Sequence, residues 1–129
     1  MKTIIAGMRD YDSPETVERL AAHVHEMYPI TEVISGGAKG VDRFGEAWAE
    51  KSGIPITPFP ADWDKYGKSA GPVRNAEMAS AADALLAVWD GESRGTRDMI
   101  RKAYKKDLRI WIYRTDQNEL LTHDPYSDA

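Results

Sequence analysis

The chain has 129 residues, and its 17 Lys and Arg against 21 Asp and Glu give a formal net charge of −4 at pH 7. This length suits one domain with its own hydrophobic core, and the acidic balance gives the whole molecule no electrostatic attraction to nucleic acid or an anionic membrane. The absence of cysteine excludes a disulfide scaffold, thiol chemistry and a Cys-ligated zinc site. The N-terminal apolar run, residues 3–6, is too short for a signal peptide or a membrane span, so we expect a cytoplasmic protein with no membrane partner.

Five apolar runs of strand length alternate with segments of helical period. The runs are residues 3–6, 33–35, 54–57, 84–88 and 110–113. Their continuous apolarity predicts strands that are covered on both faces. The first two helices are expected from Pro14 to about Tyr28 and from Val41 to just before Gly53. The other two are expected at about 72–82 and 96–106, with Thr96 as a natural N-cap.

Strand and helix in alternation predict an α/β fold, a Rossmann-like three-layer sandwich with a five-stranded parallel sheet in the order 3-2-1-4-5. Residues 1–113 would form this domain. Residues 114–129 lack a core period, so we expect them to form a flexible C-terminal arm. In such a sheet the ligand crevice lies beyond the carboxyl ends of the strands, here the loops 7–12, 35–42, 58–72 and 89–97. The first loop supplies the candidates Gly7 and Arg9.

The second loop is rich in glycine and leads from a strand into a helix. Glycines in this setting let backbone N–H groups approach a phosphate at the positive end of the helix. Its candidates are Gly36, Gly37, Ala38, Lys39 and Gly40. The spacing is neither that of a Walker A loop nor that of the dinucleotide motif, and a plain tight turn is the alternative. Asp42 follows, either as an acid favoured by the helix dipole or as the group that holds a ribose hydroxyl.

Two further segments carry polar residues at the starts of helices. Arg74, followed by Asn75, lies where the helix dipole disfavours a cation, which indicates an anion clamp in the crevice rather than a solvated side chain. The segment after the fourth apolar run predicts a second phosphate or sugar site, with simple capping by Thr96 as the alternative. Its candidates are Asp90, Gly91, Gly95 and Thr96.

Together, the Gly36-Gly37-x-x-Gly40, Arg74-Asn75-x-x-Met78 and Gly95-Thr96 motifs resemble the SLOG superfamily, and most of all its small YspA-like members, over residues 2 to about 113. The resemblance implies nucleotide binding. The Lonely Guy members of the superfamily are phosphoribohydrolases that cleave the N-glycosidic bond of nucleoside monophosphates, and their catalytic arginine falls on Arg74. Their catalytic glutamate falls on Met99, whose thioether cannot transfer a proton. An acid or base would then be Asp98, Glu92, Asp90 or another residue.

Two segments leave alternatives open. The loop 58–72 is long enough for a lid or a partner surface, and Trp63 or Tyr66 in it would either stack on a base or pack onto the sheet. Residues 94–109 carry seven Lys and Arg against two Asp. Such a segment would contact nucleic acid or form a solvated face, and we favour the solvated face because no aromatic platform accompanies the charges. DNA-processing protein A, another SLOG member, binds single-stranded DNA.

The sequence therefore predicts a domain that binds a nucleotide or nucleotide derivative at the strand ends. Hydrolysis of an N-glycosidic or phosphoribosyl bond, with Arg74 stabilising charge and Asp98 or Glu92 as acid or base, is one hypothesis. The alternatives are a non-catalytic sensor or carrier and, less favoured, a single-stranded nucleic-acid module. We expect no metal and no cofactor. We also expect a homodimer, because small domains often complete their sites by dimerising and SLOG hydrolases are commonly dimers.

Overall fold

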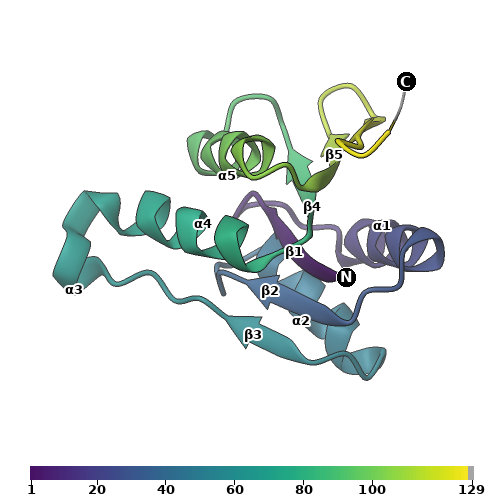
Figure 1. Cartoon of the computed structure of the whole chain (residues 1–129), viewed down its shortest axis with the longest axis horizontal. Helices are drawn as coiled ribbons and strands as arrows, with labels where there is room; N and C mark the ends of the chain where they lie inside the picture. Colours follow the sequence, from purple (N-terminus) through teal and green to yellow (C-terminus); the bar gives the residue numbers. More distant parts are fainter. Residues whose placement is uncertain (128–129) are drawn as a thin grey trace.

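Six strands form one sheet in the order β3-β2-β1-β4-β5-β6 in the computed structural model, which describes residues 1–127 (Figure 1). The strands are β1 (Lys2–Gly7), β2 (Glu32–Ser35), β3 (Ile56–Pro58), β4 (Ala84–Trp89), β5 (Arg109–Arg114) and β6 (Glu119–His123). The first five pair in parallel. This confirms the predicted α/β fold and the strand order 3-2-1-4-5.

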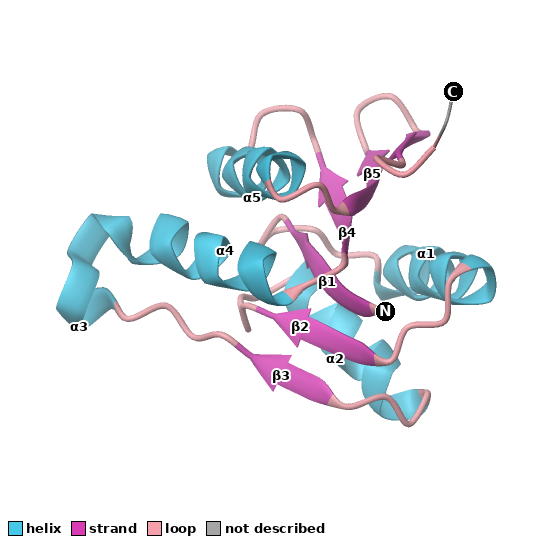
Figure 2. Ribbon diagram, in the orientation of Figure 1, coloured by secondary structure: helices cyan, strands magenta, loops and turns pink. Residues whose placement is uncertain are grey.

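Helices cover both faces of the sheet, which gives three layers (Figure 2). They are α1 (Pro14–Met27), α2 (Val41–Lys51), α3 (Trp63–Tyr66), α4 (Ala70–Ala81) and α5 (Arg94–Lys105), with a 3-10 turn at Gly67–Ser69. Successive strand residues point to opposite faces. Ile5 packs in a core with α1 and α2, which includes Trp48. Its neighbour Ile4 packs in a second core with α4 and α5, which includes Met78 and Met99. The apolar runs are continuous because both faces are covered.

The C-terminal segment differs from the expected loose arm. Residues 119–123 form β6, which pairs antiparallel with β5 and makes the sheet six-stranded. The turn between the two strands is held by the Tyr113 hydroxyl, 2.6 Å from Asn118 Oδ1, and by Arg114, 2.7 Å from Asp116. Leu120 packs against the core, while most of the edge strand is exposed. One inward side chain is too weak a signal for sequence periodicity to detect.

The strand order changes direction at β1, which pairs with β2 on one side and with β4 on the other. The chain that leaves β1 enters α1 on one face, and the chain that leaves β4 enters α5 on the other. In parallel sheets this divergence opens a crevice at the carboxyl ends of the two strands. The site residues should therefore be sought there.

Candidate functional site

A cavity of about 610 Å³ lies at the carboxyl ends of β1 and β4. Small-molecule sites typically have volumes of roughly 300–1,000 Å³, so this one is large enough for a nucleotide. It is lined by the end of β1, the loop before α2, the α3–α4 region and the start of α5. The lining residues are 6–10, Ala38, Asp42, Trp63, Gly71, Pro72, Arg74, Asn75, Met78, residues 93–96, Asp98 and Met99.

The structure brings many of the predicted site residues together, although they come from distant parts of the chain. Those that line the cavity are Gly7, Arg9, Ala38, Asp42, Arg74, Asn75, Gly95, Thr96 and Asp98. Those that lie outside its lining are Gly36, Gly37, Lys39, Gly40, Asp90, Gly91 and Glu92. The residues of the second group lie in the loop before α2 and in the turn between β4 and α5, which they help to shape.

Arg74, in the second turn of α4, reaches across to the glycine loop. Its Nη1 donates to the Gly36 carbonyl at 2.9 Å, and its Nε donates to Asn75 Oδ1 at 3.1 Å. A side chain at Gly36 would overlap the guanidinium, so glycine is needed for this approach. These bonds use two of the five guanidinium N–H donors. Arg74 is thereby fixed in the wall of the cavity as a cation with donors to spare.

Asp42 is the buried acid of the cavity, with only 4 % of its surface exposed. Its carboxylate accepts from the N–H of Ala38 at 3.3 Å and from the N–H of Gly7 at 3.4 Å. Burial raises the pKa of Asp42 to about 6, although these two N–H groups and Arg74 favour the charged form. The side chain therefore joins the glycine loop to the end of β1, and it changes charge close to neutral pH.

Several N–H groups of the glycine loop and of the start of α2 already donate to acceptors in the protein. Gly37 N–H donates to Ser35 Oγ at 3.1 Å, Ala38 N–H to Asp42, and Val41 N–H to the Met8 carbonyl at 3.3 Å. Gly37 and Gly40 have φ values of 72° and 77°, which side-chain-bearing residues rarely adopt. The loop is thus a tight turn with positive-φ glycines, and fewer of its N–H groups remain for a phosphate than the sequence suggests.

Asp98 lies in a polar network between α4 and α5. Its carboxylate accepts from Asn75 Nδ2 at 2.9 Å and pairs with Lys102 at 2.7 Å. Lys102 also donates to the Pro72 carbonyl at 2.9 Å, and Asn75 Nδ2 lies 3.4 Å from the Gly95 carbonyl. This network fixes the starts of the two helices relative to each other. Met99, at the position of the Lonely Guy glutamate, is buried in the core.

The start of α5 faces the cavity without a capping side chain. The prediction that this helix begins at Thr96 is wrong, because α5 starts at Arg94 and its N-cap is Ser93. Thr96 instead lies in the first turn, with its hydroxyl 3.3 Å from that of Ser93. Ser93 makes no side-chain capping bond, and the first turn carries no acidic residue. A side chain at Gly95 would meet no atom within 4 Å. The first-turn N–H groups, which have no partner within a helix, are therefore open to a ligand.

The turn between β4 and α5 contains three predicted site residues that lie outside the cavity: Asp90, Gly91 and Glu92. Asp90 accepts from the N–H groups of Ser93 at 2.8 Å and Glu92 at 2.9 Å, and these bonds lower its pKa. Gly91 has φ 84°, and a side chain there would overlap Arg114. Glu92 is exposed. These three residues shape the turn that presents the start of α5.

The sequence did not reveal that Lys102 neutralises Asp98. The four-residue spacing of the two side chains on one helix was the available signal. Nor did it reveal the bond from Ser35 Oγ to Glu46, at 2.6 Å, which fixes the hydroxyl that accepts from the Gly37 N–H. This contact joins a strand end to the second turn of α2, so it follows only from the tertiary structure.

Comparison with known proteins places this geometry in a family. The YAcAr family, described as "YspA, cpYpsA-related SLOG family", matches residues 1–66. The "Gene 61 protein" of Mycobacterium phage D29 is 37 % identical over 116 residues, which cover 84 % of this chain and 93 % of that protein. The chain belongs to the YspA-related SLOG family. Its membership confirms the predicted SLOG resemblance, and the matched residues include the glycine loop.

A solved structure shares the fold. DNA processing protein A (DprA) from Streptococcus pneumoniae superposes with a TM-score of 0.71 at 15 % identity, over 86 % of this chain. The chain spans about half of that protein, 49 % of its length, so the likeness concerns the fold of one part of it.

Two features are absent from residues 1–127, the part of the chain that the structure describes. None of the helices there is both long and apolar enough to cross a membrane. Within the same residues, His, Asp and Glu side chains form no group of three or more that could hold a metal ion.

Proposed function

We propose that this SLOG domain binds a nucleotide derivative in the cavity at the ends of β1 and β4, with the phosphate at the start of α5. The observation that carries the proposal is the uncapped first turn of α5, which opens into the same cavity as the fixed guanidinium of Arg74. Helix N-termini bind phosphate through their free N–H groups and the positive end of the dipole. Arg74 adds a cation to that environment.

The start of α5 suits a phosphate better than the glycine loop does. The N–H groups of Gly37, Ala38 and Val41 already have protein acceptors. Asp42, once ionised, would also repel an anion held at that loop. We therefore assign the glycine loop and Asp42 to the sugar side of the ligand, where hydroxyl groups can donate to a carboxylate.

The variant Gly95→Asp tests the phosphate site. A Cβ at position 95 would meet no atom within 4 Å. An acidic side chain in the first turn interacts favourably with the helix dipole, and the first turn of α5 has none. The variant should therefore fold at least as stably as the parent. The new carboxylate should also occupy the place of the phosphate. In the parent, a nucleoside monophosphate at a hundredfold excess over Kd should add about 2.7 kcal/mol of stability.

In Gly95→Asp this thermal stabilisation should disappear. Ala47→Asp is the matched control, because it adds the same charge at an exposed position of α2 outside the cavity. Equal stabilisation of parent and Gly95→Asp by the nucleotide would overturn the assignment. A nucleoside without phosphate should stabilise the parent only weakly.

Hydrolysis of the N-glycosidic bond is a second candidate function, favoured by Asp42. A buried carboxyl with a pKa of about 6, close to a fixed arginine in a cavity, is suited to transfer a proton near neutral pH. Asp98 is bonded to Lys102 and Asn75, and Glu92 lies outside the cavity, so Asp42 is the better acid or base. Released base or ribose 5-phosphate, measured by chromatography and lost in Asp42→Asn, would support this function. Ligand binding without turnover would support the sensor or carrier.

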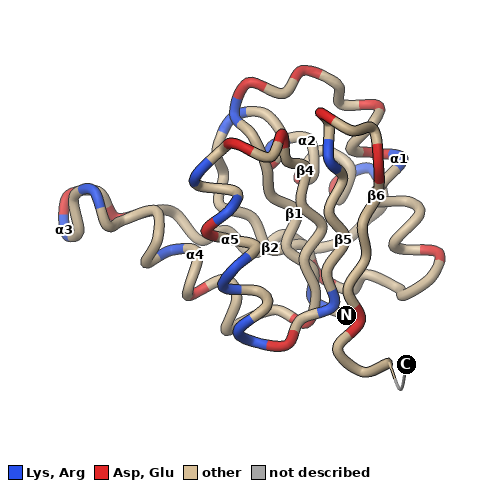
Figure 3. Tube along the Cα trace, turned by 90° about the horizontal axis from the view of Figure 1, so that it is seen from above, with Lys and Arg blue, Asp and Glu red and all other residues tan. Residues whose placement is uncertain are grey.

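Nucleic acid and a second copy of the chain are the two candidate macromolecular partners. Arg101 and Lys105 of α5 and the C-cap residue Lys106 are exposed, and Figure 3 shows a run of basic residues there. We propose that they form a solvated face. Binding of single-stranded DNA that falls steeply with salt would contradict this proposal. We also propose a homodimer, which light scattering would detect.

A further inference from the structure

The short helix α3 extends away from the sheet, beyond the carboxyl ends of the strands (Figures 1 and 3). Asp62 caps it by accepting from the Lys65 N–H at 3.1 Å. Residues 62–69 are all exposed, including two aromatic side chains, Trp63 at 53 % and Tyr66 at 39 %. Tryptophan is seldom left so exposed, which points to a role outside the protein's own core.

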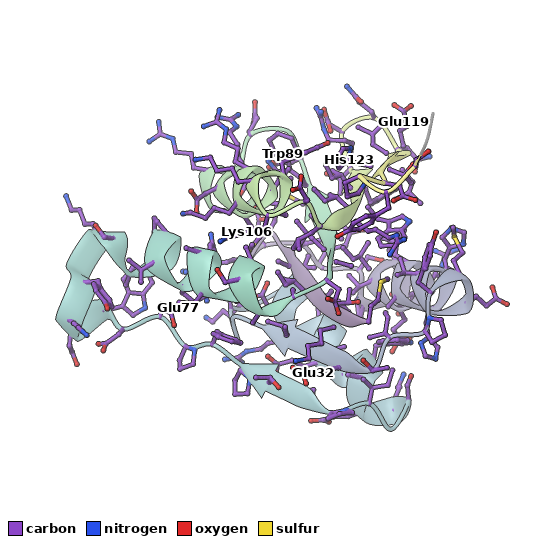
Figure 4. The ribbon with its side chains drawn as sticks, viewed as in Figure 1. Glu32, Glu77, Trp89, Lys106, Glu119 and His123 are labelled. Carbon is purple, nitrogen blue, oxygen red and sulfur yellow. The ribbon has the colours of Figure 1, made fainter. Side chains whose placement is uncertain are left out.

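The two aromatic side chains of α3 face different hollows. Trp63 lines the large cavity described above, together with Gly71, Pro72 and Arg74. A side chain at Gly71 would lie 3.9 Å from the Trp63 ring, so the ring lies beside the first turn of α4. Tyr66 lines a second hollow of about 350 Å³, formed with Phe59 and with Glu77, which projects from α4 toward the segment before α3 (Figure 4).

The lining of the large cavity changes character between its two sides. The α5 side presents open N–H groups, and Arg74, Asn75 and Asp98 add polar atoms. The α3 side presents the flat ring of Trp63, exposed over half its surface. A nucleotide has the same polarity, with an anionic phosphate at one end and a flat aromatic base at the other.

We propose that Trp63 stacks on the base of the bound nucleotide, which makes α3 the base-recognition element of the site. This inference rests on the proposed function and names the ligand class more closely, as a nucleotide with an intact aromatic base. Stacking contacts the face of the base and makes no hydrogen bonds to its edge, so it does not depend on the hydrogen-bonding groups of the base. Purines, which have the larger face, should therefore bind more tightly than pyrimidines.

Calorimetric titration with AMP and with ribose 5-phosphate tests the inference, because the two ligands share a phosphate and a ribose and differ in the base. Trp63→Ala should weaken AMP binding by roughly 5- to 150-fold and leave ribose 5-phosphate binding unchanged. Trp63→Phe should restore most of the AMP affinity. Tyr66→Ala, on the same exposed helix but outside the large cavity, is the matched control and should bind both compounds like the parent.

The outcomes separate this inference from the function on which it rests. If the parent binds neither compound, the proposed function is wrong and the stacking role falls with it. If the parent binds both and Trp63→Ala binds AMP as tightly as the parent, only the stacking role is wrong. An equal loss of both ligands in Trp63→Ala, with a change of oligomeric state in light scattering, would assign α3 to a subunit interface instead.

Discussion

Replacing Asp42 by asparagine should change how the stability of the protein depends on pH. Burial raises the pKa of this carboxyl from 3.8 to about 6, so the folded state binds its proton more tightly than the unfolded state. The stabilisation from this proton is complete below about pH 3.8 and is lost as the pH rises through about 6. At about 1.36 kcal/mol for each pKa unit, the full loss is about 3 kcal/mol.

Asp42→Asn removes this titration but also changes the bonding to the loop. The amide has one acceptor oxygen, so it cannot accept from Gly7 and Ala38 through two separate oxygens as the carboxyl group does, and the loss of one bond should make the variant less stable. This penalty is the same at every pH. The informative quantity is therefore the change with pH in the difference between parent and variant.

Urea unfolding between pH 4 and pH 8, followed by tryptophan fluorescence, measures that difference. The parent should lose about 2.4 kcal/mol relative to Asp42→Asn over this range, with most of the change between pH 4 and pH 6. Asp64→Asn, which removes an exposed carboxylate of α3, provides the reference for the loss of one negative charge. A difference between parent and Asp42→Asn that stays constant, or that changes in the parent's favour as the pH rises, would refute the reasoning.

Substitutions of Arg74 and Gly40 test the wall of the cavity and the glycine loop. Arg74→Ala should weaken binding of a nucleoside monophosphate by about 1.5–3 kcal/mol in calorimetry, and Arg74→Lys should restore little because an ammonium group lacks the planar donor geometry. Parent-like affinity in both variants would show that Arg74 does not contact the ligand. Gly40→Ala should destabilise the fold by about 1–3 kcal/mol or more in urea unfolding, because the new Cβ would overlap the Met8 carbonyl at positive φ. Gly53→Ala has a similar φ of 69° but open space, so an equal cost for the two would contradict the close-approach argument.

The sequence predicts the sheet well because its signals are local and strong. The five parallel strands overlap continuous apolar runs, and parallel strands joined by helices leave few arrangements. The edge strand β6 escapes this reasoning because it contributes little more than Leu120 to the core. The start of α5 was misplaced because Gly95 and Thr96 resemble the end of a loop, whereas the Asp90 turn already completes the loop two residues earlier.

The site could be predicted as a set of loops but not as a set of contacts. The sequence singles out Arg74 by its expected place at a helix start, whereas the structure puts it in the second turn of α4, bonded to the Gly36 carbonyl. The raised pKa of Asp42 depends on the burial of its side chain in the folded chain, which no local pattern records. Likewise, Glu92 and Asp98 look alike as acids in the sequence, and only the folded chain separates an exposed residue from one paired with Lys102.

A crystal structure of the chain with AMP bound tests the central claim most directly. The account predicts phosphate oxygens at about 2.7–3.2 Å from the N–H groups of Gly95 and Thr96, with the ligand in the cavity that holds Arg74. A phosphate bound instead by the loop 36–40, or a nucleotide bound outside the cavity, would contradict it.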